Sequence, residues 1–175
     1  MLKDAHISPD GRYRYWLARE WDTLRRQPVL FIMLNPSTAD ASQDDPTIRK
    51  CIGFAKAWGY GRIEVVNLYA FRATDPKALK ASGYDVGPNN NMQILHYARW
   101  SGLVVAAWGA HAQKDRADAV VKMLAPHHDI QCLGLTKDGF PRHPLMVAYK
   151  QPLVLFEGQP ADSSLVVPRR LRSFR

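Results

Sequence analysis

Short apolar segments that are typical of buried strands alternate along this chain with segments of helical spacing. The expected strands are residues 29–34, 63–68, 103–108 and 130–135. The expected helices are residues 46–58, 76–81, 90–100 and 113–124. Such alternation is typical of a parallel sheet with helices on both faces. The sequence therefore predicts the fold class α/β, as a three-layer α/β/α domain with a mostly parallel central sheet of about four strands.

The two ends of the chain differ in pattern from its middle. Residues 12–17 alternate polar and aromatic side chains, as in a half-exposed strand. We expect a single domain over residues 1–156, because the pattern weakens after Pro152. Residues 157–175 carry four arginines near their end and are expected to be loop or disordered. This basic tail is either an arm for an anionic partner or a solvated end without a role.

The overall charge favours an anionic partner, of which nucleic acid is the commonest. The chain has a net charge of +8, but four of these charges belong to the tail arginines. No apolar run approaches the ~20 residues of a membrane span, so no membrane contact is expected. The first residues lack the apolar core of a secretory signal, which makes the cytoplasm the expected compartment.

Two cysteines, Cys51 and Cys132, lie inside apolar segments. Free buried thiols are a better explanation of this placement than a disulfide. Two thiols are also too few for a four-cysteine metal site or iron–sulfur cluster.

Polar side chains follow each of the four predicted strands. Asn35 follows the first, and Pro36 both ends the ladder and biases Asn35 toward an extended conformation. Asn67 lies within the second strand, where an unpaired buried amide costs ~1–3 kcal/mol. His111 and His143 follow the third and fourth. Because the carboxyl ends of parallel strands share one edge, we expect one crevice whose amides and imidazoles suit a planar nucleobase.

Each of these residues also has a purely structural explanation. Asn35 can form a turn, Asn67 can bond to a loop, and both histidines can be ordinary loop residues. An acidic cluster follows Asn35, and a metal site there with His143 is one interpretation of it. Capping of the next helix by Asp44 or Asp45 is simpler, so no metal is expected.

Read in order, these segments resemble the motif series of the uracil-DNA glycosylase superfamily. Residues 104–114, VVAAWGAHAQK, resemble the strand-to-helix segment of the uracil-specific enzymes. The Asn-Pro at 35–36 resembles the motif after the first core strand of the mismatch-specific branch, and residues 143–144 resemble the His-Pro motif. The chain also resembles a family of bacterial and phage proteins of unknown function, through LNPSTAD, DDPTIR, VVNLYAFRAT and TKDGFPRHPL over residues 12–155.

The glycosylase resemblance implies a uracil-DNA-glycosylase-like fold and dissociative hydrolysis of an N-glycosidic bond, with no metal or organic cofactor. Asn35, together with Asp40, would hold the attacking water. Asn67 would hydrogen-bond the flipped base, and His143 would stabilise the departing base anion. The same resemblance places Ser37 and Pro36 in the base site. It places contacts to DNA or phosphate at Arg142, His111 and Lys137.

Three departures from the superfamily pattern modify this expectation. Asn35 stands where the uracil-specific enzymes carry an aspartate, and an amide can orient water but cannot take its proton. Ser37 stands where they carry a bulky aromatic residue, so the pocket is expected to admit 5-substituted pyrimidines. The His-Pro motif is shortened before Leu145, which leaves the DNA-intercalating wedge in doubt.

These observations predict a glycosylase-like enzyme that acts on a damaged or modified pyrimidine in DNA. One alternative is a module of the same fold that binds a modified base or nucleotide without cleaving it. A third interpretation is a hydrolase of a free nucleoside or nucleotide-like molecule. The expected partner is therefore nucleic acid, DNA rather than RNA, or a nucleotide-like ligand.

Overall fold

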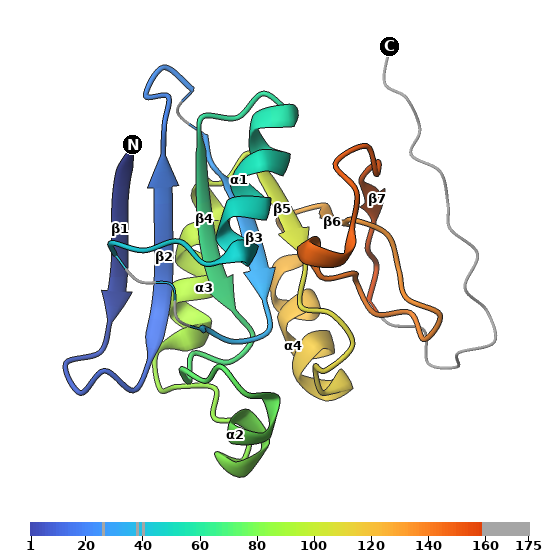
Figure 1. Cartoon of the computed structure of the whole chain (residues 1–175). Coiled ribbons are helices and arrows are strands. Elements are labelled where there is room, and N and C mark those ends of the chain that lie inside the picture. Colours follow the sequence, from blue (N-terminus) through green and yellow to red (C-terminus); the bar gives the residue numbers. More distant parts are fainter. Residues whose placement is uncertain (26, 38, 40, 159–175) are drawn as a thin grey trace.

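The centre of the molecule is one mixed β-sheet. The structure is a computed structural model that describes residues 1–25, 27–37, 39 and 41–158 (Figure 1). Within these residues the sheet has seven strands in the order β1-β2-β4-β3-β5-β6-β7. They are β1 (Leu2–Ile7), β2 (Arg14–Glu20), β3 (Val29–Met33), β4 (Arg62–Asn67), β5 (Leu103–Ala106), β6 (Ile130–Cys132) and β7 (Val154–Leu155).

The expected sheet of about four mostly parallel strands, with a uracil-DNA-glycosylase-like architecture, is wrong. The four apolar strands β3 to β6 are present and pair in parallel. The pairings β1–β2, β2–β4 and β6–β7 are antiparallel, so half of the strand pairings run against the expected direction. The general α/β class remains compatible with the observed sheet and helices.

The missed strands have weak local signals. β1 is mostly exposed and its sequence, LKDAHI, has no clear apolar face. β7 is two residues long, which is too short for any periodicity.

The direction of β2 follows from the short segment that connects it to β3, which is only residues 21–28. A parallel neighbour would need a crossover of about a dozen residues. β2 therefore pairs antiparallel with β4 instead.

Helices cover both faces of the sheet, close to the predicted positions. α1 (Pro46–Ala57) lies on one face, and α3 (Asn90–Trp100) and α4 (Lys114–Leu124) lie on the other (Figure 1). The short α2 (Pro76–Ala81) lies beyond the carboxyl ends of β3 and β4, and a 3-10 turn, η1 (Pro144–Met146), packs near α1. The predicted helices are thus confirmed. In the described part of the chain, no helix could cross a membrane.

The two faces of the sheet form two separate apolar cores. One core joins α1 to the side chains of Phe31 and Val65. The other joins α3 and α4 to Ile32 and Val66, on the opposite side of the same strands. This arrangement follows from the alternation of side chains along a strand, which makes strands covered on both faces apolar throughout. Cys51 and Cys132 are buried in these cores as free thiols, as predicted.

The order of the central strands creates a crevice at their carboxyl ends. The chain leaves β3 toward α1 on one face and leaves the adjacent β5 toward α4 on the other face. Because the two connections diverge, the sheet edge between them is left open. The end of β3 is therefore the place where a ligand site is expected.

Candidate functional site

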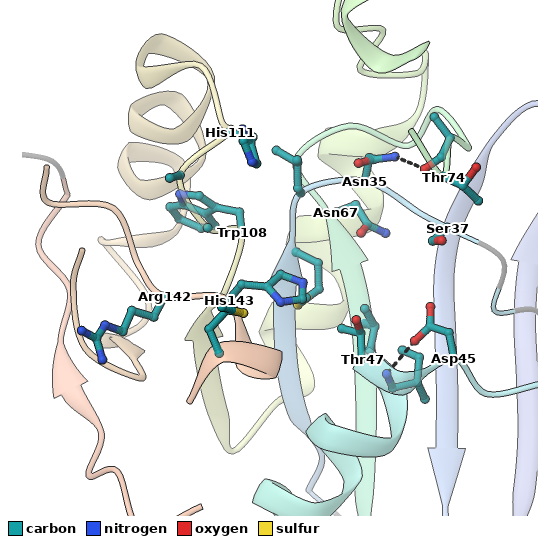
Figure 2. A pocket seen from close by; sticks show the side chains of 18 of the residues that line it. Asn35, Ser37, Asp45, Thr47, Asn67, Thr74, Trp108, His111, Arg142 and His143 are labelled. Atoms are coloured by element: carbon teal, nitrogen blue, oxygen red, sulfur yellow. Dashed lines mark hydrogen bonds between the residues drawn. The ribbon is translucent and has the colours of Figure 1, made fainter. Parts of the chain in front are cut away.

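A cavity of about 750 Å³ lies at this edge, and we call it the edge cavity (Figure 2). It is lined from the ends of β3, β4 and β5, the start of α1, and the segment before η1. Four of the polar residues predicted from the sequence line it together, from four separate segments: Asn35, Asn67, His111 and His143. The expected convergence of these side chains is confirmed, while their catalytic and binding roles stay predictions.

Asn35 is held at the cavity wall by its amide nitrogen. Nδ2 donates hydrogen bonds to the carbonyl oxygens of Ala73, at 2.8 Å, and Pro36, at 3.1 Å. These bonds fix the rotation of the side chain and leave Oδ1 as its acceptor. Figure 2 shows Oδ1 on the side of the amide that faces away from the Nδ2 hydrogen bond. Asn35 can therefore accept a hydrogen bond from a water or ligand, but it has no lone pair basic enough to take a proton.

Asn67 is buried at the base of the cavity with an unused amide. Its side chain is only 1% exposed. Among the described residues, neither its Nδ2 nor its Oδ1 has a hydrogen-bond partner. A buried donor and acceptor left unpaired cost about 1–3 kcal/mol each, and such groups in native proteins call for an explanation. The Asn67 amide is therefore a strong candidate for contact with a bound molecule.

The backbone that carries Asn67 is itself anchored by a second buried amide. Asn90, at the start of α3, is completely buried. Its Nδ2 donates to the carbonyl oxygens of Asn67, at 2.8 Å, and Leu68, at 3.0 Å. These bonds hold the end of β4 in a fixed position against α3. Asn90 thus uses its amide nitrogen for structure and has only its Oδ1 unpartnered in the described chain, whereas neither amide atom of Asn67 has a partner there.

His143 faces the cavity as a neutral imidazole. Burial lowers its pKa, and the charge of Asp45 opposes only part of that shift. Its Nδ1 accepts a long 3.4 Å hydrogen bond from the backbone N–H of Leu145 and caps η1. With Nδ1 as an acceptor, the neutral ring carries its proton on Nε2. His143 can therefore donate a hydrogen bond from Nε2 to a ligand.

Asp45 supplies a carboxylate that the sequence favours as a helix cap and does not place in the cavity. It does cap α1, since Oδ1 accepts from the backbone N–H of Ile48 at 2.8 Å. It also lines the edge cavity, and its second oxygen points to the side of Ser37 (Figure 2). Thr47, in the first turn of α1, lines the same wall. The strong capping signal of Asp-Pro at 45–46 concealed this second placement.

The remaining predicted residues are placed as follows. Ser37 lines the cavity, and Arg142 lines it while being largely exposed. Pro36 is buried next to the cavity but does not line it. Lys137 is exposed and also lies outside the lining. Asp40 lies outside the described residues.

Arg14 is a cavity residue that the sequence pattern missed. It comes from β2, which was predicted over 12–17 as half-exposed. Instead all but the last residue of β2 is buried, and Arg14 is only 3% exposed. Its Nη1 donates to the carbonyl oxygen of Ala39. A buried arginine in the lining favours a ligand with electron-rich or anionic groups, and no local sequence signal announces its burial.

Two acids of the cluster near this wall, Asp44 and Asp45, make structural contacts. The Asp44 carboxylate contacts the fully buried Arg19 at 2.5 Å and Lys3 at 3.3 Å. Asp45 caps α1, in agreement with the capping interpretation. Within the ranges that the structure describes, no group of three or more His, Cys, Asp or Glu side chains is arranged to hold a metal ion.

Comparison with known proteins identifies a family but no activity. No curated protein and no solved structure matches the chain, and no link to the uracil-DNA glycosylase superfamily is found. A family model described as "Protein of unknown function (DUF1643)" matches residues 14–145. That range includes Asn35, Asp45, Asn67 and His143, and it covers well over half of the sequence. The chain therefore belongs to the DUF1643 family.

Proposed function

We propose that the edge cavity binds a pyrimidine-type nucleobase of DNA and that the protein hydrolyses its N-glycosidic bond. The observation that carries the proposal is the buried Asn67 amide, whose donor and acceptor lack partners in the described chain. An amide offers one donor and one acceptor side by side, which matches the hydrogen-bonding edge of a pyrimidine. Binding of such a base would satisfy both groups at once.

The groups around Asn67 fit the charges that develop when an N-glycosidic bond breaks. The departing base becomes negative, and the Nε2 proton of neutral His143 can stabilise it by a hydrogen bond. The sugar becomes positive, and the Asp45 carboxylate supplies a negative charge in the same cavity. The Asn35 Oδ1 can orient the water that attacks the sugar, with the proton passing to the Asp45 carboxylate.

The balance of the reaction requires only water as a second reactant. The bond between the sugar carbon and the base nitrogen breaks, and the base leaves with the electron pair. Water adds its oxygen to the sugar carbon and loses one proton to Asp45. That proton is finally taken by the base or by solvent. No step requires a redox partner or a group beyond these side chains.

One observation favours a second function, which is binding of a base without cleavage. The Asp45 carboxylate is already engaged through Oδ1 in capping α1, and Asn35 cannot take a proton. If the second Asp45 oxygen does not reach the water, the cavity recognises a base but does not activate a nucleophile.

The test uses oligonucleotides that carry uracil or a 5-substituted pyrimidine, in single and double strands. We expect abasic sites, detected as alkali-labile breaks. Asp45→Asn keeps an acceptor for the cap and should retain binding while cleavage falls by about a hundredfold or more. Asp129→Asn, an exposed acid outside the cavity, is the matched control. Binding without any breaks supports the second function, and absence of both binding and breaks refutes the proposal.

A further inference from the structure

A second, smaller cavity adjoins the edge cavity under α2, and we call it the α2 cavity. Its volume is about 210 Å³. It shares two lining residues with the edge cavity, Leu34 and His111. Its complete lining is Leu34, Lys77, Leu79, Lys80, Tyr84 and His111. A ligand that fills the edge cavity can therefore extend past these two shared residues into the α2 cavity.

Every polar side chain that lines the α2 cavity can donate a hydrogen bond to an anion. Lys77 and Lys80 come from consecutive turns of α2, and no acidic residue lines the cavity. Both lysines are exposed, and within the described ranges neither ammonium forms an ion pair or a hydrogen bond. The nearest acid in sequence, Asp75, uses its side chain to cap α2 at the N–H of Lys77. Neither lysine ammonium is therefore paired with a carboxylate in the described chain, and Asp75 keeps its charge at the start of α2.

Tyr84 provides an independent sign of a built site. It is the one non-glycine residue with positive φ in the described chain, at 57°. The end of α2 is closed by hydrogen bonds from Gly83 to Lys80 and from Tyr84 to Leu79. Such a closure needs only one left-handed residue, and Gly83 supplies it. A second left-handed residue costs about 1–2 kcal/mol, and strain of this kind concentrates at functional sites.

The position of α2 is tied to the edge cavity through Asn35. Asn35 Nδ2 holds the carbonyl of Ala73, and Thr74 lines the edge cavity immediately before the α2 cap. The side chain that we propose to orient water therefore also fixes the segment that leads to Lys77 and Lys80. α2 lies just beyond the carboxyl ends of β3, which Asn35 follows, and of β4, which ends at Asn67 (Figure 1).

We infer that the α2 cavity binds a phosphate group of the nucleotide whose base occupies the edge cavity. The inference rests on the proposed base-binding function and extends it to the substrate class. Lys77 and Lys80 donate charge-assisted hydrogen bonds to the phosphate oxygens, with His111 and the Tyr84 hydroxyl completing the set. The phosphate is either the 5′-phosphate of a free nucleotide or a backbone phosphate of DNA, since both present the same oxygens.

The experiment measures binding of four molecules to the full chain by calorimetry at about 50 mM salt. They are 2′-deoxyuridine, its 5′-monophosphate, 2-deoxyribose 5-phosphate, and a single-stranded oligonucleotide with one deoxyuridine. We expect the monophosphate to bind about tenfold more tightly than the nucleoside. Lys77→Gln/Lys80→Gln should abolish that difference and leave nucleoside affinity within about twofold. Lys122→Gln/Lys150→Gln, two exposed lysines outside both cavities, is the control of equal charge.

The outcomes separate the two proposals. If the nucleoside binds through Asn67 and the phosphate adds nothing, the α2 cavity inference is wrong and base binding stands. If only the phosphate-bearing molecules bind, dependent on Lys77 and Lys80 but not on Asn67, the phosphate site stands without the proposed base site. If Lys77→Gln/Lys80→Gln weakens binding of the oligonucleotide alone, the bound group is a backbone phosphate of DNA. If it weakens binding of the monophosphate, the bound group is the 5′-phosphate of a free nucleotide. An equal loss in the control variant overturns the inference, because it indicates general charge attraction.

Discussion

Replacing the unpartnered amide of Asn67 by an apolar group of similar shape should make the protein more stable and weaken its binding of a base. In Asn67→Leu, two methyl groups take the places of Nδ2 and Oδ1. Both of these atoms are buried and unpaired within the described chain. Removing an unsatisfied buried polar group recovers about 1–3 kcal/mol. The adjoining cavity of about 750 Å³ leaves room for the slightly larger side chain.

We therefore expect the free energy of unfolding to rise by about 1–3 kcal/mol in Asn67→Leu. For a chain of this length that corresponds to a gain of roughly 3–10 °C in Tm. Asn90→Leu is the matched control, since Nδ2 of Asn90 donates two hydrogen bonds to the end of β4, while its Oδ1 is unpartnered in the described chain, as both amide atoms of Asn67 are. That variant should lower the free energy of unfolding by about 1–3 kcal/mol. Both substitutions replace asparagine by leucine, yet they should change the free energy of unfolding in opposite directions.

Urea unfolding followed by tryptophan fluorescence measures both changes, and the nucleoside calorimetry described above measures binding. Asn67→Leu should lose at least about tenfold in affinity, because the ligand edge loses both hydrogen-bond partners. A destabilisation equal to that of Asn90→Leu would show that the Asn67 amide is a structural group. A stabilised variant with unchanged affinity would refute its role in recognition.

Three further predictions concern groups outside this amide. Because burial lowers the pKa of His143, the unfolded chain binds its proton more strongly. The free energy of unfolding should therefore fall as the pH drops below about 6.5, less steeply in His143→Gln, and identical pH profiles would contradict this. Burial raises the pKa of the Cys132 thiol to about 11 and raises that of Cys51 as well. A thiol reagent at about pH 8 should label both at least a hundredfold more slowly in native than in urea-denatured protein, and fast native labelling would show that the cores open. Asp44→Asn removes the carboxylate that lies 2.5 Å from the fully buried Arg19. The free energy of unfolding should therefore fall by about 3–5 kcal/mol. An unchanged free energy of unfolding would mean that the other partners of Arg19 are enough to stabilise its charge.

The sequence predicts the interior of the sheet well because its signals there are local. Strands covered on both faces are continuous apolar runs, as in β3 and β5. Asp75 as the cap and the proline that follows it indicate the start of helix α2. The antiparallel outer strands depend instead on which segments meet in space. Nothing within LKDAHI specifies that β1 pairs with β2.

The residues of the candidate site likewise divide into those that the sequence reveals and those that it hides. Asn35 and Asn67 are visible from the sequence because a polar residue within or directly after an apolar strand is locally conspicuous, and His143 is visible through its His-Pro motif. Arg14 is hidden, since no local pattern marks its burial and its Nη1 donates to the carbonyl oxygen of Ala39, which is distant in sequence. Asp45 is hidden for another reason: its capping role fully explains its identity, and only the fold shows that its other oxygen faces the cavity.

The margins of the sheet bear on how the protein behaves at high concentration. An unpaired strand edge is a template on which another chain can add by backbone hydrogen bonding. Here β1 carries Lys3 and Asp4 and its pairing register shifts between His6 and Ile7, which distorts the outer row of N–H and C=O groups. β7, at the opposite margin, is only two residues long. Each margin thus offers a poor template, so the central apolar strands are protected from intermolecular β-aggregation.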